Sequence, residues 1–167
     1  MLVGFSCLLI FICCAIIVLE VSLLIYTNMT KKALRLCFEK HKEQFDKSGI
    51  PYVFHPFHLA EQMSDEKTTV VALLHDIVED TDCTLDFLRT EGFDEEIVEA
   101  VALMTHDKKA MPNYMDYVAK IKQNPIARAV KLADLTHNSD LSRLDEITDE
   151  AIRRREKYLE AMKLLEK

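Results

Sequence analysis

Apolar residues recur every three or four positions through most of the chain, which is the spacing that places them on one face of an α-helix. The clearest example surrounds the string HDIVED, where six apolar side chains would share one side of a helix: Val70, Val71, Leu73, Leu74, Ile77 and Val78. Strand-like alternation is scarce, and the 167 residues include only 3 glycines and 4 prolines. The pattern therefore predicts an all-α protein. It predicts helices over residues 30–45, 56–63, 66–79, 84–90, 94–104, 114–121, 125–137 and 148–166.

Residues with strong backbone preferences mark several ends of these helices. Thr30 and Asp94 are placed as N-caps, because a side-chain oxygen there can accept a hydrogen bond from a free backbone N–H. The string Ser48-Gly49-Ile50-Pro51 is a turn signal. Pro125 suits the first turn of a helix, and Gly92 suits a helix end. These signals fall where the periodicity also predicts a boundary.

The polar side of the predicted helix over residues 66–79 carries unusual charge. Residues four apart lie one above the other on a helix, so an imidazole and three carboxylates would project together from His75, Asp76, Glu79 and Asp80. The sequence has no lysine or arginine between Lys67 and Arg89 to offset them. One interpretation is a solvated polar face. The other is a metal site, because a cation relieves the repulsion between carboxylates.

The first 28 residues differ from the rest and are treated as a separate segment, followed by one domain over residues 29–167. Residues 2–26 are apolar enough, and long enough, to span a bilayer as an N-terminal apolar helix. Lys31, Lys32 and Arg35 follow, and would keep the domain on the cytoplasmic side. The alternative is a mis-assigned start, because Met29 begins a stretch typical of a small soluble protein. The expected location of the domain is cytoplasmic in either case.

Charge and cysteine content limit the function. The chain has 21 basic and 28 acidic residues, a net charge of −7, which argues against a nucleic-acid partner. A small phosphorylated ligand held through a metal ion is compatible with this charge. Cys37 and Cys83 are the only cysteines after residue 28 and form no CxxC pair, which indicates a reducing compartment.

The remaining candidate chemistry lies in four segments: His55, His75-Asp76, Glu79-Asp80 and Asp134 with Asn138. Imidazoles and carboxylates suit Mn²⁺, Mg²⁺ or non-haem iron. Such a site can bind a phosphate oxygen and lower the pKa of a bound water. Glu79 and Asp80, one turn beyond His75 and Asp76, are placed to orient or deprotonate that water. The sequence has no glycine-rich loop of the kind that cradles the phosphates of ATP.

Three strings carry a family resemblance: SGIPYVFHP (residues 48–56), ALLHDIVEDT (72–81) and KLADLTHN (131–138). In their order and spacing they resemble the hydrolase domain of RelA/SpoT proteins, which belongs to the HD superfamily of phosphohydrolases. The resemblance covers roughly residues 30–144. It implies an all-α HD-domain helical bundle with a single metal ion, usually Mn²⁺. The implied reaction removes the 3′-pyrophosphate of (p)ppGpp.

The resemblance also implies residue roles. The implied metal ligands are His55, His75, Asp76 and Asp134. Glu79 and Asp80 match the pair that activates water, and Asn138 matches a nucleotide contact. Long members of the family carry a synthetase domain after this one. Because the sequence stops at Lys167, no synthesis of (p)ppGpp is expected.

Two departures affect the substrate side. Asp46 stands where the family commonly has an arginine that packs on guanine, and a carboxylate there would repel phosphates. Leu135-Thr136 stands where the family has Arg-Leu. Lys47 is a candidate to supply positive charge, and His41, on the first predicted helix, is a further candidate substrate contact.

Three functions follow as hypotheses. The first is hydrolysis of (p)ppGpp to GDP or GTP and pyrophosphate. The second is hydrolysis of another nucleotide, such as NADPH or a deoxynucleotide, and it is suggested by Asp46, which stands in place of the family's arginine. The third is a sensor that binds a metal and a nucleotide without turnover. The presence of Glu79 and Asp80, which match the water-activating pair, favours an enzyme over this hypothesis. His58, His106 and His137 are interpreted as packing or surface residues, and Lys131 as the partner of an acid.

Overall fold

The computed structural model describes residues 28–167, and every regular element in that range is helical. A first helix over residues 28–41 is followed by α2 (Phe54–Glu61), α3 (Glu66–Leu74), α4 (Ile77–Asp80), α5 (Leu85–Thr90), α6 (Glu95–Met104), α7 (Tyr114–Ile121), α8 (Pro125–Ser139), the 3₁₀ turn η1 (Leu141–Arg143) and α9 (Asp149–Glu166). The predicted all-α class is confirmed. The proposed apolar helix and membrane anchor over residues 2–26 lie outside the described residues, as does nearly all of the separate segment over residues 1–28. Within residues 28–167, no helix combines the length and apolar character needed to cross a bilayer.

Most predicted helix ends match the structure, because capping side chains fix them. Thr84 accepts from Phe87 N at the start of α5, and Thr148 accepts from Ala151 N at the start of α9. Asn124, directly before Pro125, accepts from two backbone N–H groups at the start of α8. Gly92, after α5, has φ of +81°, a conformation that costs other residues energy. These ends depend on local chemistry, which a sequence pattern captures.

Two predicted boundaries are wrong. The first helix already includes residue 28, so Thr30 lies inside it rather than capping it. It also ends at residue 41 rather than near Phe45, because residues 44–52 turn back on themselves. Phe45 and Pro51 form an isolated antiparallel bridge, and Gln44 O accepts from Tyr52 N. The loop over residues 44–52 therefore projects from the bundle instead of continuing a helix.

The predicted helix over residues 66–79 is interrupted at His75 and Asp76. Asp76 has φ of −102° and ψ of 0°, outside the usual helical values, and α4 begins after it. His75 Nδ1 lies 2.8 Å from Ala72 O, so the side chain competes for a carbonyl that a continuing helix would use. The predicted single polar arc is thus wrong. His75 is buried, and Glu79 and Asp80 follow on a separate turn.

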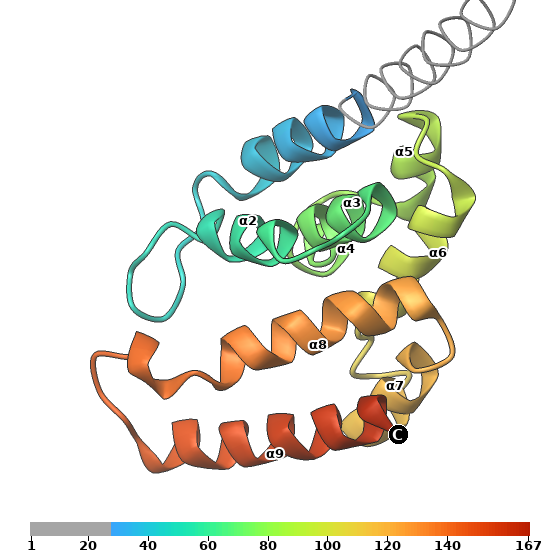
Figure 1. Cartoon of the computed structure of the whole chain (residues 1–167). Helices are drawn as coiled ribbons and strands as arrows, with labels where there is room; N and C mark the ends of the chain where they lie inside the picture. The colour runs from blue at the N-terminus through green and yellow to red at the C-terminus, as the bar shows by residue number, and fades with distance from the viewer. Residues whose placement is uncertain (1–27) are drawn as a thin grey trace, which may run out of the picture.

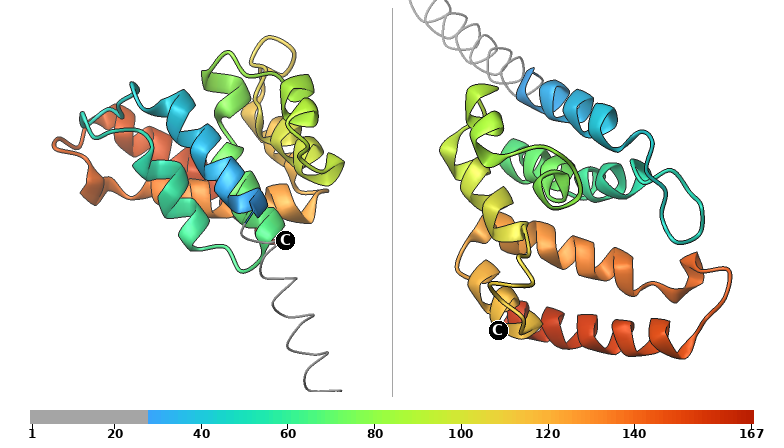
Figure 2. Two further views of the ribbon diagram at one scale, coloured as in Figure 1. Left: turned by 90° about the horizontal axis from the view of Figure 1, so that it is seen from above. Right: turned by 180° about the vertical axis from the view of Figure 1, so that it is seen from behind.

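The helices stack so that α3 and α8 form the centre. In Figures 1 and 2 the first helix lies over α2 and α3, α8 lies beneath them, and α9 covers the other side of α8. Helix α3 is buried over most of its length, through Thr68, Val70, Val71, Ala72, Leu73 and Leu74. Since α2 and α3 both contact α8, side chains at the facing ends of three helices meet in the interior.

Candidate metal centre and active site

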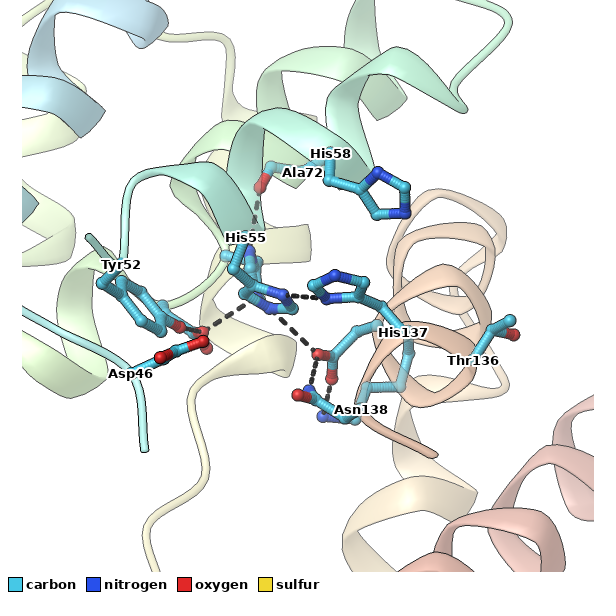
Figure 3. Close-up of polar contacts among 12 residues, drawn as sticks. Asp46, Tyr52, His55, His58, Ala72, Thr136, His137 and Asn138 are labelled. Carbon is cyan, nitrogen blue, oxygen red and sulfur yellow. Dashed lines mark hydrogen bonds and ion pairs between the residues drawn. The ribbon is translucent and has the colours of Figure 1, made fainter. Parts of the chain in front are cut away.

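Four predicted ligands come together from three parts of the chain. His55 lies in the first turn of α2, His75 and Asp76 lie at the junction of α3 and α4, and Asp134 lies in α8. His55, His75 and Asp134 are buried, with exposed fractions of 6%, 1% and 5%. Buried polar side chains need partners. Here they are partners of one another, because His55, labelled in Figure 3, contacts both His75 and Asp134 through Nε2.

The distances fit a common ion. His75 Nε2 lies 2.8 Å from Asp76 Oδ2 and 3.3 Å from His55 Nε2. Donor atoms bound about 2.1 Å from one ion, at angles between square and tetrahedral, lie about 3.0–3.4 Å apart. The two imidazole nitrogens meet this spacing, and the His75–Asp76 pair is slightly closer. One donor atom from each of these three residues lies within 4.8 Å of the others. Asp134 Oδ1 lies 3.3 Å from His55 Nε2 and is outside that trio, so it adds a fourth donor from one side.

The charges within the cluster favour ionised carboxylates and a bound positive charge between them. Burial tends to lower the pKa of His75, but Asp76 outweighs burial and raises that pKa to about 9. Burial tends to raise the pKa of Asp76, but His75 lowers it to about 2. Burial also acts against ionisation of Asp134, yet Lys131 and His55 hold its pKa well below the usual range. Two ionised carboxylates beside two imidazoles are a donor set for a divalent ion.

Further side chains hold one oxygen of Asp76 and both oxygens of Asp134. Tyr52 OH donates to Asp76 Oδ2. Lys131 Nζ donates to Asp134 Oδ2 at 2.8 Å, and Asn138 Nδ2 donates to Asp134 Oδ1. The prediction that Lys131 pairs with an acid is confirmed. These contacts restrict how each carboxylate can turn, which is the usual role of groups behind metal ligands.

Glu79 and Asp80 lie on α4, after the break. Glu79 Oε2 accepts from His106 N at 2.9 Å, on the connection between α6 and α7. Asp80 is an exposed residue, but partial desolvation of its carboxyl group, together with the charges of Asp76 and Glu79, raises its pKa. A carboxyl group with a raised pKa accepts and releases protons closer to neutral pH. Of the pair, Asp80 is therefore the stronger candidate for proton transfer.

Two of the three predicted substrate contacts line one cavity, of about 330 Å³. Lys47 reaches it from the loop over residues 44–52, and Asn138 from α8. Arg154 and Tyr158 of α9 lie in the same wall. His41 is buried instead, bonded to Gln44 Oε1 at 2.7 Å, and its ring is 5.2 Å from that of Tyr52. His41 thus supports Tyr52 and does not line this cavity.

Asp46 is not a free negative charge. Its Oδ1 accepts from Ser48 N and Ile50 N, at 2.9 and 3.0 Å. Its Oδ2 lies 3.4 Å from an Arg143 nitrogen. The carboxylate shapes the loop and pairs with a guanidinium, so the predicted repulsion of phosphates is largely offset.

Sequence reasoning missed several residues at this site: Tyr52, His137, Arg143, Arg154 and Tyr158. Tyr52 and His137 lie inside the strings SGIPYVFHP and KLADLTHN, which was the available signal. His137 Nδ1 lies 2.7 Å from His55 Nδ1, so His137 is more than a packing residue. Burial, with the nearby His55 and Arg143, lowers the pKa of His137 to about 4. The other three residues had no local signal in the sequence.

Known proteins with similar sequences carry names from one group. The 3′-pyrophosphohydrolase for guanosine-3′,5′-bis(diphosphate) from Aquifex aeolicus is 33% identical over 118 residues, 65% of this chain and 17% of that protein. The GTP pyrophosphokinase of Myxococcus xanthus is 33% identical over 139 residues, 74% of this chain and 18% of that protein. The bifunctional (p)ppGpp synthase/hydrolase SpoT of Escherichia coli is 35% identical over 120 residues, 65% of this chain and 17% of that protein. The chain thus spans about a sixth of the length of these curated relatives. No protein-family model matches it.

A solved structure shares the fold over nearly the whole domain. It is described as a metazoan ortholog of SpoT that hydrolyzes ppGpp and plays a role in starvation responses. It aligns with a TM-score of 0.62 and 27% identity, over 83% of each chain. The helical bundle and its His–Asp cluster define an HD-type domain. Within that class, the chain is a homologue of the SpoT/RelA-type proteins.

Proposed function

We propose that this chain is a metal-dependent phosphohydrolase that removes the 3′-pyrophosphate of (p)ppGpp. The products are GDP or GTP and pyrophosphate. The observation that carries the proposal is the convergence of His55, His75 and Asp76, with Asp134 beside them, in a homologue of proteins named for this reaction. Synthesis of (p)ppGpp is not part of the proposal.

These four side chains would hold one divalent ion, with Mn²⁺ the first candidate. Imidazole nitrogens and carboxylate oxygens are suitable ligands for Mn²⁺, whereas thiolates select softer metals. His75 Nδ1 faces Ala72 O, which leaves Nε2 free for the ion. A bound ion would act as a Lewis acid on a phosphate oxygen and lower the pKa of a bound water.

The proton is handled by residues of α4. Asp80, with its raised pKa, would accept the proton of the attacking water, and Glu79 would help to orient it. Glu79 is restrained through His106 N, so it acts from a fixed position. General base catalysis of this kind contributes roughly 10²–10⁴-fold in rate.

The nucleotide would occupy the cavity lined by Lys47, Asn138 and Arg154. Asn138 and Tyr52 both line this cavity and both contact metal-site carboxylates, so the cavity adjoins the cluster. Lys47 and Arg154 offer charge for phosphate groups. Pairing of Asp46 with Arg143 removes the main objection to an anionic substrate. No feature of residues 28–167 favours NADPH, a deoxynucleotide or binding without turnover over this assignment.

A substrate panel tests the proposal. The full chain, purified with Mn²⁺, is incubated with ppGpp, NADPH and deoxynucleotides, and products are separated by anion exchange. We expect GDP and pyrophosphate from ppGpp, and loss of this activity in His75→Ala and Asp76→Ala. Thr136→Ala is the matched control, because Thr136 is on α8 but points away from the cluster (Figure 3). Full activity in His75→Ala would refute the assigned site, and tight ppGpp binding without product would favour a sensor.

A further inference from the structure

A second histidine is aligned with metal ligand candidate His55. His137 Nδ1 lies 2.7 Å from His55 Nδ1, the ring centroids are 4.8 Å apart, and the ring planes differ by 20°. A centroid separation this much longer than the nitrogen contact means that the rings meet edge to edge, close to one plane. That is hydrogen-bond geometry rather than face-to-face stacking. Figure 3 shows the contact on the side of His55 that faces α8.

Counting protons sets the direction of this hydrogen bond. His55 Nε2 faces His75 Nε2 and Asp134 Oδ1, each at 3.3 Å, so Nε2 is the atom directed at the cluster. A metal-bound imidazole nitrogen carries no proton, and the neutral ring then keeps its proton on the other nitrogen. His55 Nδ1 must therefore donate. His137 Nδ1 must accept, so His137 keeps its own proton on Nε2.

The surroundings hold His137 in place. Its carbonyl accepts from an Arg143 nitrogen at 3.2 Å, near the end of α8. Its ring lies 4.5 Å from that of His58, on α2. His58 and His55 are three residues apart on α2, so α2 contacts His137 from two sides. The ring of Tyr52 also contacts that of His55, with the two centroids 5.6 Å apart.

We propose that His137 is a positioning residue that accepts the Nδ1–H of His55 and so fixes the tautomer and orientation of that ligand. In most protein metal sites a carboxylate, carbonyl or water takes this position. Here a neutral imidazole does. The inference depends on the proposed metal site, but not on (p)ppGpp being the substrate.

The first test measures metal affinity without turnover. Metal-free protein is titrated with Mn²⁺, and free ion is followed by electron paramagnetic resonance. His137→Phe keeps a flat ring but cannot accept a hydrogen bond, so we expect affinity to fall about 10–100-fold. His137→Gln can accept through its amide oxygen, so affinity should recover most of that loss. Thr136→Ala should bind as the parent protein does.

The second test does not depend on a variant folding. Nitrogen-15 chemical shifts of the parent protein, loaded with diamagnetic Zn²⁺, report which ring nitrogens are protonated. We expect protons on His55 Nδ1 and His137 Nε2. Protonation of His137 on Nδ1 would overturn the proposal, as would parent-like Mn²⁺ affinity in a folded His137→Phe protein. If ppGpp is not hydrolysed while both results hold, the positioning role stands and only the substrate assignment fails.

Discussion

The metal cluster and the substrate-facing loop are built differently. The cluster draws His55, His75 and Asp134 from the interior ends of packed helices, and each is almost fully buried. The loop over residues 44–52 is held by an isolated bridge and by polar contacts to residue 143, and its Phe45 is 63% exposed. Core packing constrains the first region at every side chain. The second can change its residues at little cost, and one of the two departures from the family pattern, Asp46, lies in it; the other, Leu135-Thr136, follows Asp134 in α8.

Substitutions near the metal cluster and substitutions in the loop should differ most in their effect on kcat. Asp80→Asn keeps the shape of the side chain but cannot accept a proton, so we expect kcat to fall by about 10²–10⁴-fold with thermal stability nearly unchanged. The pH profile gives a second check. Because the pKa of Asp80 is raised, the parent should lose activity on acidification at a higher pH than an ordinary aspartate would impose. Unchanged kcat in Asp80→Asn would remove Asp80 from the mechanism.

Stability should also separate the two regions. Lys131→Met leaves Asp134 buried without its cationic partner, so the free energy of unfolding of metal-free protein should fall by about 3–5 kcal/mol. Urea denaturation in the presence of EDTA measures this. Lys120→Met, on the exposed side of α7, is the control and should change stability little. A loss below about 1 kcal/mol in Lys131→Met would mean that the pair is solvated rather than buried.

The stability of the metal-free protein should depend on pH through the cluster. The pKa of His75 is raised from 6.5 to about 9 in the folded state, so protonated His75 stabilises the fold below pH 6.5. That contribution is lost as the pH rises from 6.5 towards 9. Thermal melting with EDTA should therefore show a decline over this window. With saturating Mn²⁺ the decline should be absent, because the ion replaces the proton; an equal decline in both samples would contradict this.

The loop region should give smaller effects, confined to substrate binding. Lys47→Ala and Arg154→Ala each remove one charge from the cavity, so we expect KM for ppGpp to rise about tenfold with kcat nearly constant. Asp46→Asn serves as the comparison, since it keeps the loop's hydrogen bonds while weakening the ion pair with Arg143. Its stability should change by less than about 1 kcal/mol. If Lys47→Ala lowered kcat as much as Asp80→Asn does, the loop would take part in the chemical step.

The sequence was sufficient for features set by local chemistry. Most of the helices follow from periodicity, and capping residues mark the starts of α5, α8 and α9. The four candidate ligands lie in strings recognisable by order and spacing. Features set by contacts between distant residues were missed. The contact between Asp46 and Arg143 joins residues 97 positions apart, and that between His55 and His137 joins residues 82 apart. Neither has a periodic signature.

The break between α3 and α4 was missed for a different reason. Apolar spacing continues through Ile77 and Val78, so the pattern predicts one helix. The turn at Asp76 is imposed by side-chain bonds of His75 and Asp76 to Ala72 and Tyr52, which periodicity does not register. A site residue here overrides the local helical preference, as is common where function constrains the backbone.

One measurement tests the central claim most directly: release of pyrophosphate from ppGpp by the full chain, with Mn²⁺ added back after treatment with EDTA. The parent should be inactive after EDTA and recover with Mn²⁺. Asp134→Asn, which keeps the size of the ligand but not its charge, should fall by about 10²–10³-fold at the same Mn²⁺ concentration. Pyrophosphate release that survives EDTA, or that Asp134→Asn leaves unchanged, would contradict the account.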